Sequence, residues 1–220
     1  GKPPELPQSS MLLADLPVIT NPQWVKTVDT FFSADQGGKS INIGLPETVR
    51  VKTPSLSLGG QAWQNLDLSF NLLAKEQQIK VSSENLKGEL QIFAQQPWAL
   101  NIDYLYYNPM AFPGEQTTSS NDSSSFNFSH WPEMTVNCQD CWAGGQKLGK
   151  LSAHLKPQGN TLQLSGGTLS NSATQLKLDA LWQSGKQNRT QIAGSLSGKQ
   201  FDETAAYYGI LVPIIGSPYT

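Results

Sequence analysis

Apolar and polar residues alternate along most of this 220-residue chain. The segment Leu66-Asp67-Leu68-Ser69-Phe70 is a clear example, and similar segments recur between residues 49 and 104 and between 151 and 196. A period of two places all the apolar side chains on one face of an extended strand, whereas a helix would require a period near 3.6. The alternation therefore predicts a mainly β chain of antiparallel strands with one apolar face.

Two segments carry a helical pattern instead. Residues 22–34 follow a possible N-cap at Asn21, have Pro22 at the first helical position, and carry apolar residues at helical spacing. Residues 202–211 begin with Asp202 as a possible cap and are rich in alanine and tyrosine. We predict short helices near 22–34 and 202–211.

The β pattern is interrupted once and then resumes. Residues 108–130 are polar and without periodicity, which is typical of a flexible linker or loop. Leu45-Pro46-Glu47 is matched by Trp131-Pro132-Glu133, and Gly59-Gly60-Gln61 by Gly144-Gly145-Gln146, each about 85 positions later. These matches predict an internal repeat. The alternative is chance similarity between two β meanders that share turn residues.

These patterns divide the chain into five predicted parts. They are an N-terminal segment with the first helix (1–40), a first β repeat (41–107), the linker (108–130), a second β repeat (131–200), and a C-terminal helix with an apolar tail (201–220). The tail looks like the cut end of a longer protein.

Composition narrows the classes of function. Lys and Arg number 15 against 17 Asp and Glu, and only 15% of residues are charged, which disfavours binding to nucleic acid. No apolar run is long enough to span a membrane. The carboxylates are scattered, Asp103 is typical of a solvated strand residue, and no nucleophile motif is present. We therefore predict neither an enzyme nor a cofactor.

Several local features occur here in one order. Asp15-Leu16-Pro17-Val18-Ile19 leads into the Trp-bearing predicted helix, and Cys138-Gln139-Asp140-Cys141-Trp142 leads into Gly144-Gly145-Gln146. A strand then ends in Leu181-Trp182, and Phe201 opens a helix that ends in Tyr208-Gly209. This combination resembles the C-terminal part of large AsmA-like proteins of the Gram-negative envelope, relatives of AsmA and TamB. The resemblance is weakest at 1–12 and 108–130.

The resemblance implies a fold, a location and a function. It implies a parent protein anchored in the inner membrane, with a periplasmic body in which a repeated, curved antiparallel sheet forms an elongated apolar groove. Such proteins are related to bridge-like lipid-transfer proteins. The implied role is to shield phospholipid during transport between the inner and outer membranes, with components of both membranes as partners.

The apolar phase of the alternation supplies the candidate groove lining. The alternative is that these residues form an ordinary packed core, in which case the domain is a structural or partner-binding scaffold without a lipid conduit. The candidate lining residues are Leu66, Leu68, Phe70, Leu72, Ile79, Val81, Leu90, Ile92, Leu100, Ile102, Leu151, Ala153, Leu155, Leu162, Leu164, Leu176, Leu178, Ala180, Trp182 and Leu196.

The two cysteines form a single Cys-x-x-Cys motif at Cys138 and Cys141. Redox catalysis of the thioredoxin type would need a helix N-terminus, but the flanking residues are typical of strand and turn. A metal site would need two further ligands, and the only histidines are His130 and His154. In the oxidising periplasm that the resemblance implies, we expect a disulfide that pins a β-bulge, or otherwise two unreactive thiols.

Overall fold

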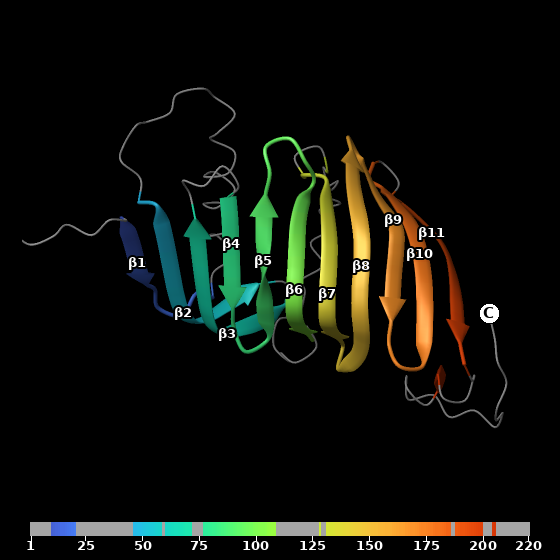
Figure 1. Cartoon of the computed structure of the whole chain (residues 1–220), viewed down its shortest axis with the longest axis horizontal. Coiled ribbons are helices and arrows are strands. Elements are labelled where there is room, and N and C mark those ends of the chain that lie inside the picture. The colour runs from blue at the N-terminus through green and yellow to red at the C-terminus, as the bar shows by residue number, and fades with distance from the viewer. Residues whose placement is uncertain are drawn as a thin grey trace, which may run out of the picture.

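The computed structural model describes residues 10–20, 46–58, 60–71, 77–108, 128, 131–185, 188–199 and 204–205. These residues form an 11-stranded sheet in which spatial order follows sequence order (Figure 1). The strands are β1 (Met11–Asp15), β2 (Thr48–Leu58), β3 (Gln61–Asn71), β4 (Gln77–Ser82), β5 (Leu86–Ile92), β6 (Trp98–Tyr107), β7 (Met134–Ala143), β8 (Gln146–Gln158), β9 (Thr161–Ser170), β10 (Thr174–Gln183) and β11 (Arg189–Gly198). The prediction of a mainly β chain is confirmed.

The sheet is mixed rather than antiparallel throughout. β1 pairs with β2 in parallel, and β6 pairs with β7 in parallel, whereas every other neighbouring pair in the described sheet is antiparallel. The expectation of a purely antiparallel sheet is therefore wrong at these two junctions. Parallel neighbours require a long connection, and residues 16–47 and 108–133 provide one at each junction.

Several predicted features lie outside the described residues. These are the helix at 22–34, almost all of the linker at 108–130, and Leu72. Of the second predicted helix, only Thr204 and Ala205 are described, and both are helical. Within the described chain, no helix has the length and apolar composition that crossing a membrane would require.

The strand register separates the sheet into two chemically different faces. Side chains of cross-strand partners lie on the same face, so a row of partners can be followed from strand to strand. One row crosses β2 to β6 through Arg50, Ser69, Lys80, Glu89 and Asn101. Each strand position next to this row carries its side chain on the opposite face. We call the face with this row the polar face and the other the apolar face.

A cluster of buried apolar side chains lies where β2 and β3 bend. Leu56, Trp63 and Leu66 are 7%, 9% and 5% exposed and pack together. Trp63 and Leu66 are three positions apart and would face opposite sides of a regular strand. Asn65 between them has a φ of 51°, a left-handed conformation that interrupts the alternation. The bend brings both side chains into one cluster.

This bend carries the end of the β2–β3 hairpin across the sheet (Figure 1). Gln61 Nε2 donates to the carbonyl oxygen of Tyr106 at 2.8 Å, and Gln61 Oε1 accepts from the Asn108 amide at 2.6 Å. The ring of Trp63 stacks on Tyr107, with centroids 6.5 Å apart. The hairpin end therefore docks on β6 and covers part of the apolar face.

Candidate functional site: an apolar sheet face

The strand register brings the described candidate lining residues to one face of the sheet. In the first half, Phe70, Ile79, Leu90 and Leu100 are successive cross-strand partners from β3 to β6. A second row of partners runs from β8 to β11. It consists of Leu151, Leu169, Leu176 and Leu196. The sequence had identified all of these except Leu169. Their role in lining a lipid groove remains a prediction.

The apolar face is covered unevenly. Over β3 to β6, the cluster of Leu56, Trp63 and Leu66 packs against partly buried neighbours that include Leu68 and Val81. At the other end, Ile192 on β11 is 67% exposed. Leu162 on β9 and Ala180 on β10 are buried, so over β7 to β11 the apolar face is exposed mainly at the edge strand β11.

A shallow hollow of about 360 Å³ lies over β9, β10 and β11. By register, most of its lining lies on the polar face, namely Gln163, Asp179, Leu181, Gln191 and Ala193. Three residues of the apolar face, Leu164, Ala180 and Ile192, complete the lining and are cross-strand partners. Two of these three were predicted from the alternation. Ile192 was not, although it occupies the same apolar phase of its strand as Leu196.

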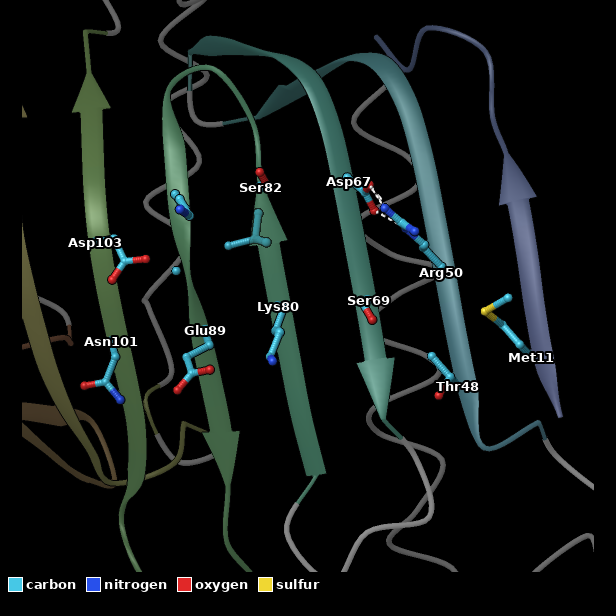
Figure 2. Close-up of a pocket in the computed structure, with 13 residues that line it drawn as sticks. Met11, Thr48, Arg50, Asp67, Ser69, Lys80, Ser82, Glu89, Asn101 and Asp103 are labelled. Carbon is cyan, nitrogen blue, oxygen red and sulfur yellow. Dashed lines mark hydrogen bonds and ion pairs between the residues drawn. The ribbon is translucent and has the colours of Figure 1, made fainter. Parts of the chain in front are cut away.

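A larger hollow of about 730 Å³ lies over the polar face, formed by β1 to β6 (Figure 2). Sequence reasoning did not find it, because the concavity depends on how the strands twist together. Its ionisable lining consists of three cations and three carboxylates, so the formal charges of the lining balance. These residues are Arg50, Lys80, Lys87, Asp67, Glu89 and Asp103.

One ion pair orders the wall of this hollow. Arg50 Nε donates to Asp67 Oδ1 at 2.8 Å, and Arg50 Nη2 donates to Asp67 Oδ2 at 2.6 Å (Figure 2). The hydrogen bond to Arg50 holds the pKa of Asp67 below its usual value, and the same contact raises the pKa of Arg50. The pair joins neighbouring strands and leaves no free charge at this point.

The predicted disulfide is confirmed. Cys138 and Cys141 are bonded to each other within β7 and are 1% and 4% exposed. The β7–β8 register shifts between them, so the bond spans a bulge as expected. In the described residues, no group of three His, Cys, Asp or Glu side chains could hold a metal ion. His154 instead contacts Glu133, with Nε2 and Oε1 2.8 Å apart.

Comparison with known proteins identifies the family. A family model described as YhdP protein matches residues 1–220. The intermembrane phospholipid transporter YhdP of Escherichia coli (strain K12) is 30% identical over an alignment of 221 positions, which covers 98% of this chain and 17% of that protein. No solved structure matches the chain. Because the family model spans the whole sequence, this chain belongs to the YhdP family.

Proposed function

We propose that this chain forms one segment of a phospholipid conduit between two membranes, with the apolar face shielding the acyl chains. The observation that carries the proposal is the separation of apolar from polar side chains across an open sheet of 11 strands. The E. coli relative is described as an intermembrane phospholipid transporter. A sheet with one apolar face must cover it with protein or with an apolar ligand, and acyl chains are such a ligand.

The dimensions of the sheet suit this role. Neighbouring strands lie about 4.8 Å apart, so 11 strands extend roughly 50 Å across the strand direction. An acyl chain spans only half of a hydrocarbon core about 30 Å thick. The apolar face is thus longer than one acyl chain and could hold lipid at successive positions.

The topology supports a repeated design for the conduit. β2–β6 and β7–β11 are each runs of five strands, and each run is entered through a parallel pairing. We propose that these runs correspond to the two sequence repeats. Adding such runs lengthens a sheet without changing which face is apolar, because each new strand pairs in register with the last.

Location and partners follow from the same proposal. We place the chain in the periplasm of a Gram-negative bacterium, within a parent protein anchored in the inner membrane. Its ligand is phospholipid, and the ends of the conduit contact components of the inner and outer membranes. The conduit moves lipid without chemical change, so it requires neither a catalytic residue nor a cofactor.

Leu178 is the sharpest position at which to test the conduit. Its side chain lies on the apolar face, and both of its cross-strand partners, Gly167 and Gly194, lack side chains. A carboxylate at this position would have to lose water or hold it among acyl chains, which costs several kcal/mol without a partner. We expect Leu178→Asp in the full-length protein to block lipid transport.

The matched control is Lys177→Asp, which places the same charge on the polar face one residue away. Its position is exposed, so transport should be nearly unchanged. Lipid exchange between membranes in cells is the readout, and protease resistance checks that each variant is folded. A folded Leu178→Asp protein that transports lipid normally would reject the conduit.

The packed cluster favours a second candidate, a structural or partner-binding scaffold. The β2–β3 hairpin already covers part of the apolar face through Trp63 and Leu56. Leu68→Asp, with Ser69→Asp as its control on the polar face, tests whether this region also carries lipid. Native mass spectrometry separates the two candidates, because a conduit should retain phospholipid after purification and a fully packed scaffold should not.

A further inference from the structure

The Cys138–Cys141 disulfide lies in the middle of the sheet, where another sulfur atom has little access. Cys138 is 1% exposed and Cys141 is 4% exposed. On one side they pair with Ile102 and Leu105 of β6, and on the other with Leu151 and Gly149 of β8. Thiol–disulfide exchange requires a third sulfur to reach the bond, and the burial of both cysteines obstructs its approach.

The pairing of β7 with β8 is irregular around the disulfide, but two register shifts in opposite directions cancel. Between Cys138 and Cys141, β7 has one more residue than β8 has opposite it, and β8 regains one residue at Leu148. Gly149, next to Leu148, has a φ of 94°, a left-handed conformation that favours glycine. It also lies close to the carbonyl oxygen of Ser170. Because the two shifts cancel, the rest of β7 and β8 keeps one register and one apolar face.

A polar cluster closes the solvent side of this bulge. Trp142 Nε1 donates to Asp140 Oδ1 at 3.1 Å, and Lys147 Nζ lies 3.0 Å from the same oxygen. Lys147 Nζ also lies 5.4 Å from the centre of the Trp142 ring. Asp140, one of the two residues enclosed by the disulfide, is thus anchored to the following strand as well.

We propose that this disulfide forms before β6, β7 and β8 pair, by exchange with a dithiol–disulfide oxidase, and that the folded sheet then protects it from exchange. Closing the bond removes two electrons from the two thiols, so an oxidant is required. The oxidant in this proposal is an enzyme with a reactive disulfide that acts on the chain before these strands pair.

The exchange is balanced in two steps. One cysteine thiolate attacks a sulfur of the oxidase disulfide, which forms a mixed disulfide and releases one oxidase thiolate. The second cysteine thiolate then attacks the sulfur of the first cysteine, which forms the Cys138–Cys141 bond and releases the second oxidase thiolate. The chain loses two protons and two electrons, and the oxidase disulfide is reduced to a dithiol.

Reduction kinetics test the protection. The full-length oxidised protein is treated with increasing dithiothreitol, quenched by alkylation, and the peptide containing residues 138–141 is quantified by mass spectrometry. We expect a rate that stops rising at high reductant, because opening of the sheet limits it, and that is at least about 100-fold slower than in denaturant. A rate that stays proportional to dithiothreitol and matches the denatured rate would overturn the proposal.

Expression with and without oxidase tests the partner. In cells that lack dithiol–disulfide oxidases, both cysteines should be alkylated, whereas in parental cells neither should be. Complete bonding in both strains would reject the requirement for an oxidase. This outcome is independent of lipid transport, which is measured separately.

Discussion

The two five-strand runs of the sheet share a topology but differ in how their apolar face is covered. In β2–β6, the first hairpin bends at Asn65 and folds back, so that Leu56, Trp63 and Leu66 are buried. In β7–β11, the first hairpin holds a disulfide-bridged bulge, and Ile192 at the far edge is 67% exposed. The second run also buries apolar side chains, with Leu162 and Ala180 8% and 5% exposed, so its exposure is concentrated at the edge strand. The same alternating pattern therefore leads to a cluster under a folded-back hairpin in one run and to an apolar face exposed at its edge in the other.

The largest expected loss of stability comes from removing the Trp63 side chain, which helps to cover the apolar face of β2–β6. Trp63→Ala deletes a side chain that is 9% exposed and stacks on Tyr107, so we expect a loss of about 3–5 kcal/mol in unfolding free energy. Leu196→Ala in the second run, at a residue 39% exposed, should cost less than about 1 kcal/mol. Denaturant unfolding measures both. Equal losses would show that the two runs are covered alike.

The next largest loss of stability is expected from a substitution in the β7–β8 bulge of the second run. Gly149 has a φ of 94°, and a Cβ there would collide with the Ser170 carbonyl oxygen, so Gly149→Ala should destabilise by about 1–3 kcal/mol. Gly185 lacks both constraints, so Gly185→Ala should change stability by less than about 0.5 kcal/mol. Hydrogen exchange should locate the loosening in β7 and β8. Uniform loosening of the sheet would contradict a local role for the bulge.

The smallest predicted effect concerns charge on the polar face. The hydrogen bond from Arg50 lowers the pKa of Asp67, so this carboxylate stabilises the folded state above its unfolded pKa of about 3.9. That contribution should be lost as pH falls through the lower folded pKa. The difference in Tm between the parent and Asp67→Asn should therefore be present at neutral pH and shrink below about pH 4.

A hydrogen bond between two uncharged side chains in the second run serves as the control for this pH effect. Ser152 Oγ and Thr168 Oγ1 are hydrogen-bonded at 2.7 Å across β8 and β9 on the same polar face. Neither hydroxyl titrates in this range, so the effect of Ser152→Ala should not change between pH 3 and pH 7 through this contact. A Tm difference for Asp67→Asn that is equally independent of pH would show that the ion pair does not contribute.

The alternation of apolar and polar residues predicts which side chains of a strand share a face, but it does not predict which strands pair with each other. The grouping of Leu66 with Leu68, and of Leu176 with Leu178, on one face of their strands follows from alternation alone. Strand β1 was not predicted, and neither was its parallel pairing with β2. Strand pairing depends on how a long connection returns to the sheet, and no short sequence window contains that information.

Some features of the candidate site could likewise be predicted from the sequence, and others could not. The Cys138–Cys141 pairing is the only one possible within a chain that has two cysteines, so the sequence could suggest it. The cover over Leu66 could not be predicted, since it depends on a left-handed conformation at Asn65 that bends a hairpin onto β6. The hollow on the polar face was missed for a related reason, because its lining comes from six strands and its shape from their twist.

The sequence by itself determined most of the strands (although not β1), which side chains within one strand share a face, and which two sulfurs can bond. These properties follow from the geometry of an extended backbone, whose side chains alternate at every residue. Only the tertiary structure decided that two junctions are parallel, that one run is capped, and that the other leaves its edge open. These outcomes depend on contacts between residues far apart in the chain, where the entropy of loop closure and the fit of whole surfaces outweigh local preference.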